Sequence, residues 1–217
     1  MEKVTINILN YNTYEKSVRC IKSCLKQEKI KFDIIVIDNK STDNSLSLLT
    51  KEFGDKVFFI ENDENYGFAK ANNLGVDFCR KQGVEYCLLL NSDIELIGKT
   101  LLYELVNGLR NTSNSAAIAP LVYNVTSNGL ELNQNDSQYL KLLRKVGVLP
   151  TNRLIKNNIV TVSEIHGSAI LVKCTSFIKT GGFPEHYFMY SEESTFAKKI
   201  LWENQLLLWY RKKEIHV

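Results

Sequence analysis

A carboxylate that follows an apolar run is the residue in this sequence best suited to chemistry. Residues 87–90 (CLLL) are apolar, as in a strand buried within a parallel sheet, and Asn91 and Ser92 separate them from Asp93. In an open α/β sheet, ligands bind beyond the carboxyl ends of the strands. Mg²⁺ prefers one or two carboxylates together with phosphate oxygens of a substrate. The stretch therefore fits a divalent-cation site, although the same short polar residues are also common where a strand ends in a turn.

Polar side chains also follow the other strands that the hydrophobic pattern predicts. Residues 4–9 lead into the NYN of residues 10–12, residues 32–37 lead into Asp38, and residues 57–60 lead into a polar loop. Strands alternating with single helices predict an α/β fold with a doubly wound, mostly parallel sheet flanked by helices. Right-handed crossovers place the carboxyl ends of such strands on one edge. That edge is expected to collect Asn10, Asn12, Asp38, Asn39, Asn65 and Asp93.

The second half of the chain carries a late pair of acids. Strands are predicted at residues 116–122, 164–173 and 206–210, and Gly167 within the second of them suggests a close backbone approach. Glu192 and Glu193 fall in the first turn of a predicted helix. The helix dipole favours carboxylates at that position, so capping alone could account for both.

Residues 124–163 differ in composition and pattern from the rest of the chain. They are rich in Asn, lack periodicity and carry basic residues between 141 and 156. Two interpretations remain open at this point. The segment is either a variable loop over the polar cleft or a solvated surface excursion.

Composition narrows the classes of partner. The 217 residues suit one large domain, and the net charge of +3 is too small for the strongly basic face expected of a nucleic-acid-binding protein. No apolar run approaches the roughly 18 residues of a membrane-spanning helix, and the N-terminus lacks the apolar core of a signal peptide. We therefore expect a cytoplasmic protein, and the weak positive charge is compatible with peripheral association with an anionic membrane.

The five cysteines show no CxxC spacing and are expected in the core. The chain stops at His216 and Val217 without a polar tail, which suggests truncation at the C-terminus.

Several well-known motifs are missing from the sequence. It contains no GxGxxG, no GxxxxGK[ST] and no GxSxG, and its three histidines do not have metal-ligand spacing. What remains is a polar cleft with amide side chains, a carboxylate suited to a metal and a late acidic pair.

Five segments, taken in order, resemble family 2 glycosyltransferases of the GT-A fold, particularly the bacterial rhamnosyltransferase-like branch. They read VTINILNYNTYEKSVRCIKS, IIVIDNKSTDNS, ENYGFAKANNLGV, LLLNSDIEL and HGSAILVKCTSFIKTGGFPEHYFMYSEESTFAKKI. The second is similar to a VDNxSTD segment, the third to NxGxAxxxN, the fourth to a DxD-type metal motif, and the last to the stretch ending in an acidic ED motif. Each segment is weakly specific, whereas their order and spacing are strongly specific. The likeness covers almost the whole chain except residues 124–163.

The resemblance implies an inverting transferase that moves a sugar from a UDP- or dTDP-linked donor to a hydroxyl of a glycan or lipid-linked acceptor. It implies a single domain, with a Rossmann-like nucleotide-binding half at 1–95 and an acceptor half at 96–217. It also implies synthesis of a bacterial surface polysaccharide, at the inner face of the cell membrane.

The resemblance also implies roles for individual residues. Asp93 would bind Mg²⁺ or Mn²⁺, with His216 as a further ligand, and Glu193 would be the base, with Glu192 as the fallback. Lys70 is expected near a phosphate of the donor. The residues expected to bind the donor are Asn10, Tyr11, Asn12, Asp38, Asn39, Asn65, Gly67, Lys70, Asn73, Asn91 and Ser92.

Two departures from the family pattern leave other functions open. Asn91 stands where the metal motif often begins with Asp, and residues 192–195 read EEST in place of ED followed by a second Asp. A non-catalytic nucleotide-sugar-binding or partner subunit is therefore an alternative. A sugar nucleotidyltransferase ranks last, because the loop at 10–13 lacks the Gly-rich, basic character that such enzymes usually need.

Overall fold

The computed structural model describes residues 3–127, 129–132, 154–156, 158–188, 192–203 and 205–216. Its first half alternates strands and helices, as the pattern predicts. The elements are β1 (Val4–Asn10), α1 (Tyr14–Cys24), β2 (Asp33–Asp38), α2 (Ser45–Phe53), β3 (Phe58–Glu61), α3 (Gly67–Lys81) and β4 (Tyr86–Asn91). These four strands pair in parallel in the order β3-β2-β1-β4. Their carboxyl ends therefore lie along one edge.

The second half extends the same sheet in mixed directions. Its elements are β5 (Glu95–Leu96), α4 (Leu101–Asn111), β6 (Ser115–Thr126), β7 (Gly129–Leu132), β8 (Leu154–Lys156), β9 (Ile159–Val162), β10 (Ala169–Lys173), α6 (Cys174–Lys179), α7 (Glu192–Trp202) and β11 (Leu206–His216). Strand β10 runs antiparallel between β4 and β6, and β11 runs parallel to β6. The predicted α/β class, with helices flanking the sheet, is confirmed.

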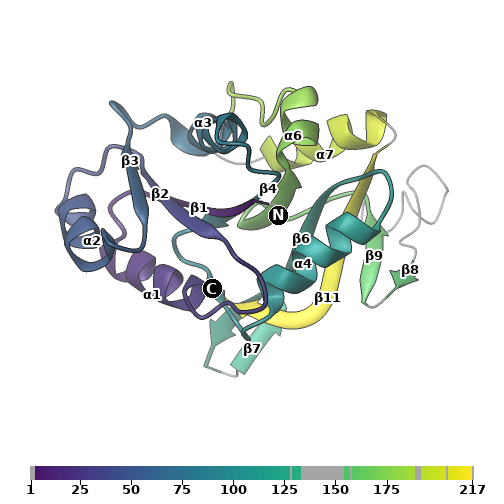
Figure 1. The fold of residues 1–217 in the computed structure, drawn as a ribbon, viewed down its shortest axis with the longest axis horizontal. Helices are drawn as coiled ribbons and strands as arrows, with labels where there is room; N and C mark the ends of the chain where they lie inside the picture. Colours follow the sequence, from purple (N-terminus) through teal and green to yellow (C-terminus); the bar gives the residue numbers. More distant parts are fainter. Residues whose placement is uncertain are drawn as a thin grey trace.

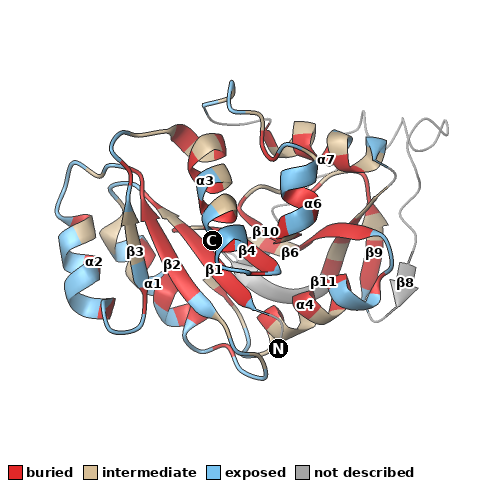
Figure 2. Cartoon of the chain, turned by 45° about the horizontal axis from the view of Figure 1, so that its top comes forward, coloured by how far each residue is buried: buried red, intermediate tan, exposed pale blue. Residues whose placement is uncertain are grey.

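Helices cover both faces of the sheet, because its strands are apolar on both sides. In β4, Leu88 and Leu90 belong to the core beneath α1, α2 and α4, whereas Cys87 and Leu89 belong to the core beneath α3, α6 and α7 (Figure 1). Alternate residues of a strand point to opposite faces, so a continuous apolar run supplies both layers at once. The inner strands β1, β2, β4 and β10 are buried along most of their length, whereas the edge strand β3 and the outward sides of the helices are more exposed (Figure 2).

Two predicted strands have different limits in the structure. The strand expected at 164–173 begins only at Ala169, since residues 166–168 form a turn held by hydrogen bonds. The strand expected at 206–210 continues to His216, because β6 and then β5 offer it further backbone partners. Such partners come from distant parts of the chain, so the local pattern cannot reveal them.

The segment predicted as a variable loop is structured at its ends. Residues 159–162 form strand β9, which pairs with β11, and residues 129–132 form β7, which pairs with β6. Most of the basic stretch between 141 and 156 lies outside the described residues. Where the chain is described, no helix is long and apolar enough to cross a bilayer.

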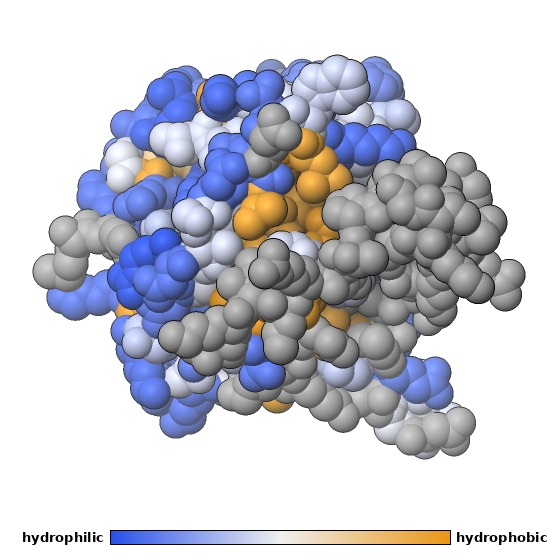
Figure 3. Space-filling model, turned by 90° about the vertical axis from the view of Figure 1, so that its right-hand side faces the viewer, coloured by the Kyte–Doolittle hydropathy of each residue, from blue (hydrophilic) through white to orange (hydrophobic). Residues whose placement is uncertain are grey.

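Several large apolar side chains are exposed on the surface, whereas the cysteines are buried. On the face at the right of Figure 1, apolar side chains are visible between hydrophilic ones (Figure 3). All five cysteines are buried as free thiols, as expected of core residues.

Shortening a buried side chain of β4 tests how far the sheet depends on the two hydrophobic cores that pack on its faces. Leu88 is fully buried between β1 and β10, so Leu88→Ala is expected to lower the free energy of unfolding by about 3 kcal/mol. Leu48→Ala on α2 makes the same change at an exposed position and is expected to cost less than about 1 kcal/mol. Urea unfolding followed by circular dichroism measures both. Equal losses would contradict a core centred on β4.

Candidate active site

A cavity of about 300 Å³ opens at the carboxyl ends of β1, β2 and β4. It combines residues predicted from the sequence with three that were not predicted, namely Leu9, Phe68 and Phe188. The predicted residues that line it are Tyr11, Asn39, Asn65, Gly67, Asn91, Ser92 and Asp93. The topology thus gathers polar side chains from four separate segments at one place.

Asn10 and Asp38 are the last residues of β1 and β2, and both are buried next to residues that line this cavity. The Asp38 carboxylate accepts hydrogen bonds from Asn10 Nδ2 at 2.7 Å, from Ser41 Oγ at 2.6 Å and from Ser41 N at 2.8 Å. Asn10 Oδ1 in turn accepts from Thr13 Oγ1 and Ser17 Oγ. Both residues are at most 1% exposed. Their side chains therefore join the ends of β1 and β2 and orient the loops that follow, and donor contact by either remains a prediction.

Asn39 performs the same task for the next loop. Its Nδ2 donates to Asn65 Oδ1 at 2.7 Å, and its Oδ1 accepts from Asn62 Nδ2 and Tyr66 N, each at 3.0 Å. These bonds hold residues 62–66 against the end of β2. Asn12 similarly accepts from Thr42 N at 2.8 Å and ties the first loop to the second.

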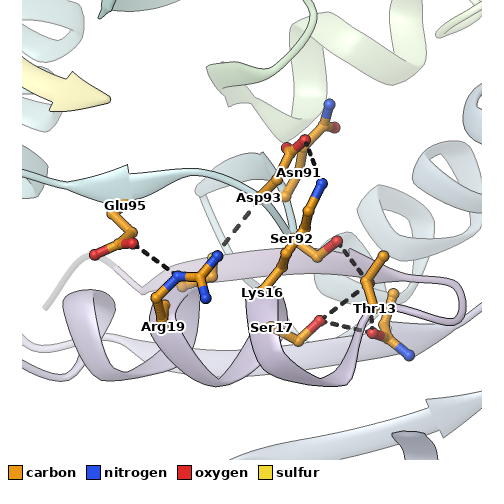
Figure 4. A network of polar contacts seen from close by, with 10 residues as sticks. Thr13, Lys16, Ser17, Arg19, Asn91, Ser92, Asp93 and Glu95 are labelled. Atoms are coloured by element: carbon orange, nitrogen blue, oxygen red, sulfur yellow. Dashed lines mark hydrogen bonds and ion pairs between the residues drawn. The ribbon is translucent and has the colours of Figure 1, made fainter. Parts of the chain in front are cut away.

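Asp93 projects from the end of β4 above helix α1 (Figure 4). Ser92 Oγ lies 2.9 Å from Thr13 Oγ1, and Lys16 Nζ lies 3.8 Å from Asp93 Oδ2. Lys16 was missed from the sequence. Arg19 lies about one turn later on α1 and pairs with Glu95 at 3.1 Å. Two basic residues on one face of the predicted helix were therefore the sequence signal that could have indicated Lys16.

The donor set around Asp93 fits a divalent cation that is completed by its substrate. No group of three or more His, Cys, Asp or Glu side chains suited to a metal occurs among the described residues. Asp93 is partly exposed and lines the cavity, and its carboxylate is paired with Lys16 at 3.8 Å. A bound cation would share this carboxylate with the ammonium group and would take its other ligands from phosphate oxygens and water. The backbone of His216 pairs with that of Glu95, two residues after Asp93. The side chain of His216 lies outside the described part of the structure.

Loop 183–188 closes one side of the cavity and is held by α3. Asn73 Nδ2 donates to Phe183 O at 2.8 Å and Asn73 Oδ1 accepts from Phe183 N at 2.9 Å. At the other end of the loop, Phe68 N donates to Phe188 O at 3.0 Å. In the described structure Asn73 therefore anchors this loop, and its contact with a donor remains a prediction.

Lys70 lies on the outer side of this region. Its ammonium group stands 3.5 Å from the centre of the Tyr66 ring and 3.9 Å from Glu64 Oε1. A cation over an aromatic ring is stabilised by the ring's electrons. Contact of Lys70 with a phosphate of the donor remains a prediction.

Glu193, one of the acidic pair, packs against the turn at residues 166–168, and this turn is bonded to a residue that lines the cavity, Asn91. Asn91 N donates to Ser168 O at 3.0 Å, so the turn is attached to the strand that carries Asp93. A Cβ atom added to Gly167 would lie 3.5 Å from Glu193 Cδ, which places the Glu193 carboxyl directly against this turn. Glu192 is 4% exposed, and burial raises the pKa of its carboxyl group by disfavouring the charged form.

A family model for glycosyl transferase family 2 matches residues 5–180 of the chain. That range contains every residue lining the cavity except Phe188, as well as the turn at residues 166–168. This chain belongs to glycosyl transferase family 2. The membership confirms the family inferred from the five segments, whereas the rhamnosyltransferase-like branch remains a prediction.

Relatives of this family 2 chain carry names from glycan and teichoic acid biosynthesis. Low-salt glycan biosynthesis hexosyltransferase Agl10 of Haloferax volcanii is 27% identical over 205 residues, which are 94% of this chain and 63% of the relative. Teichoic acid poly(glycerol phosphate) polymerase of Staphylococcus epidermidis is 31% identical over 108 residues, which are 48% of this chain and 15% of the relative. The chain thus spans less than two thirds of the length of these relatives.

Solved glycosyltransferases share the fold. GalNAc-T7, crystallised with UDP, GalNAc and Mn²⁺, superposes with a TM-score of 0.74 at 15% identity, covering 100% of this chain and 44% of its own. S. aureus TarS 1-349 in complex with UDP-GlcNAc gives 0.71 at 16% identity, covering 99% of this chain and 58% of its own. At such low identity the likeness shows the fold alone, which is GT-A.

Gly67 tests whether loop 183–188 shapes the cavity. Gly67 and Gly83 have nearly the same positive φ, 72° and 73°, but an added Cβ would lie 2.5 Å from Phe188 O at Gly67 and would meet nothing within 4 Å at Gly83. Backbone strain should cost each Ala variant about 1 kcal/mol. Gly67→Ala should lose about 1–3 kcal/mol more, or release the loop to proteases. Urea unfolding and limited proteolysis measure the difference, and identical behaviour of the two variants would contradict the contact.

Proposed function

We propose that this chain transfers a sugar from a nucleotide-sugar donor to an acceptor hydroxyl with inversion at the anomeric carbon. The observation that carries the proposal is the cavity at the carboxyl edge of the sheet, where Asp93 and the turn supporting Glu193 are attached to the same strand, β4. Membership of glycosyl transferase family 2 supports the reaction class.

The donor side of the cavity suits a nucleoside diphosphate. Tyr11 is 41% exposed on the cavity wall and offers an aromatic face for the nucleobase. Asn39, Asn65 and Gly67 form the wall opposite the end of β4. GalNAc-T7 and TarS were both crystallised with UDP or a UDP-sugar, which supports a UDP- or dTDP-linked sugar as donor.

Asp93 is the residue proposed to hold Mg²⁺ or Mn²⁺, with the donor phosphates supplying further oxygens. A bound cation supplies positive charge where negative charge develops on the leaving diphosphate. The crystal structure of GalNAc-T7 with Mn²⁺ supports a divalent cation in this fold. Lys16, already paired with Asp93, adds a second positive charge at the same edge.

Glu193 is the proposed base. The acceptor O–H proton passes to the Glu193 carboxylate, the acceptor oxygen bonds to the anomeric carbon, and the bond from that carbon to the diphosphate oxygen breaks. A hydroxyl group needs such a base within hydrogen-bond reach, because its own pKa lies far above neutral. Glu193 Oε2 is buried and has no hydrogen-bond partner among the described residues, so no protein donor competes for this oxygen.

The relatives support a role in building surface glycans. Glycan biosynthesis in Haloferax volcanii and teichoic acid synthesis in Staphylococcus epidermidis are the contexts that their names give. We therefore propose a glycan or lipid-linked acceptor, and synthesis of a bacterial surface polysaccharide at the inner face of the cell membrane. The rhamnosyltransferase-like branch and peripheral membrane association belong to the same proposal.

A donor screen tests the reaction directly. UDP- and dTDP-sugars are titrated with Mn²⁺ by calorimetry, and the donors that bind are incubated with candidate acceptors before product analysis by mass spectrometry and anomeric NMR. Retention at the anomeric carbon would contradict the single displacement. Donor binding without transfer or hydrolysis would favour a non-catalytic binding subunit instead.

Glu193→Gln removes the base while keeping the size of the side chain. Transfer is expected to fall by about 10²–10⁴-fold, because proton removal in the transition state is lost, while the Kd for the donor stays the same. Glu203→Gln, beyond the end of α7 and paired with Lys179, is the matched control and should keep full activity. Steady-state kinetics and calorimetry give the two values, and an active Glu193→Gln enzyme would exclude Glu193 as the base.

Asp93→Asn tests the cation site without any turnover. Affinity for Mn²⁺ in the presence of UDP should fall by at least about tenfold, since even indirect ligand changes cost that much in metal sites. Asp77→Asn removes a carboxylate from an ion pair on the outside of α3 and should have no effect. Electron paramagnetic resonance of free Mn²⁺ reports the affinity. Equal Mn²⁺ binding by the two variants would reject Asp93 as a ligand.

A further inference from the structure

His166 lies in the turn that carries Gly167 and Ser168, directly beside the proposed base. Its Nδ1 atom is 2.7 Å from Ser168 Oγ, and the Ser168 backbone N–H donates to the same nitrogen at 3.3 Å. Ser168 is itself fixed, because its carbonyl oxygen accepts from Asn91 N at 3.0 Å. The imidazole therefore has a defined attachment to the edge that carries Asp93.

These contacts determine which nitrogen of His166 carries the proton. A backbone N–H can only donate, so Nδ1 must present its lone pair to Ser168. The neutral ring then carries its proton on Nε2. Burial lowers the pKa of His166, while the charge of Glu193 acts in the opposite direction. The ring is thus a neutral imidazole with one remaining donor, Nε2–H.

Glu193 is the charged group that acts on this ring, and it packs against the residue next to it in the chain. Its carboxyl group packs against Gly167, where an added Cβ would lie 3.5 Å from Cδ, and its Oε2 atom is buried without a hydrogen-bond partner among the described residues. Glu192, the next acid on α7, is buried and bears on Glu193 through charge repulsion. A buried carboxylate oxygen without a partner is costly, so a donor that reaches it stabilises the site.

We propose that His166 is a positioning residue whose Nε2–H serves as the donor for the unpartnered Glu193 carboxylate during the reaction and aims it at the acceptor hydroxyl. The inference rests on the proposed role of Glu193 as the base. The sugar donor and the acceptor need not touch His166, since the ring acts on the reaction through Glu193. Ser168 serves in turn to hold the ring in the required tautomer.

The first test is the pH dependence of kcat. A donor that bonds the charged carboxylate lowers the carboxyl pKa, so its loss should move the acidic limb of the profile to higher pH. His166→Phe is expected to shift that limb upward by about one pH unit, since a hydrogen bond to a charged group is worth about that much. It should also lower kcat about tenfold with little change in the KM for the donor.

Matched variants separate this role from a loss of packing. His166→Gln keeps an N–H donor near the position of Nε2 and should restore the acidic limb of the wild-type enzyme. His186→Phe changes an exposed histidine in loop 183–188 and should leave the profile unchanged. An unmoved acidic limb in His166→Phe would overturn the inference and leave the glycosyltransferase proposal intact. A shift that His166→Gln fails to reverse would also overturn it.

The second test needs no activity. Nitrogen-15 NMR of the histidine side chains should show His166 as the neutral Nε2–H tautomer, and titration gives its pKa. Glu193→Gln removes a negative charge beside the ring, so the pKa of His166 should fall further below that of the wild-type protein. A Nδ1–H tautomer, or a pKa that does not respond to Glu193→Gln, would overturn the inference. Because this measurement uses no substrate, it decides the inference even if no donor sugar is transferred.

Discussion

The hydrogen bonds that join the ends of β1 and β2 are the constraint on which the rest of the structure depends. Parallel strands end side by side, and their last polar groups are buried there, so each must find a partner inside the protein. Asn10 and Asp38 satisfy each other, and Ser41, Thr13 and Ser17 complete the set. The loops that leave the two strands therefore have little freedom. These hydrogen bonds hold the loops that line the cavity in place.

The second half of the site depends on a reversal of strand direction. Strand β10 runs antiparallel to β4, so its N-terminal end lies beside the carboxyl end of β4. The residues just before β10 thereby reach the same edge as Asn91, and the hydrogen bond from Asn91 N to Ser168 O joins them. An all-parallel sheet would have put this turn at the opposite edge. The reversal is what brings the neighbourhood of Glu193 to that of Asp93.

Several residues expected to touch the donor also hold the loops around the cavity, and their contact with a donor remains a prediction. Asn73 is committed to the backbone of Phe183, and Asp38 is committed to Asn10 and Ser41. A sequence motif indicates that a residue is important. It does not distinguish a side chain that holds a loop from one that binds a ligand. Only burial and hydrogen-bond partners separate the two roles. Lys16 shows the converse, because its place beside Asp93 depends on how α1 crosses the end of β4.

The sequence by itself determined the α/β class, the strand-helix alternation of the first half and the polar residues at the carboxyl edge. These follow from local periodicity and from the rule that parallel strands end together, and both can be read along the chain. Tertiary structure alone decided the direction of β10, the length of β11 and the contact of Glu193 with the turn at 166–168. Those features arise from pairing between segments far apart in the chain, whose free energy depends on partners that no local pattern specifies.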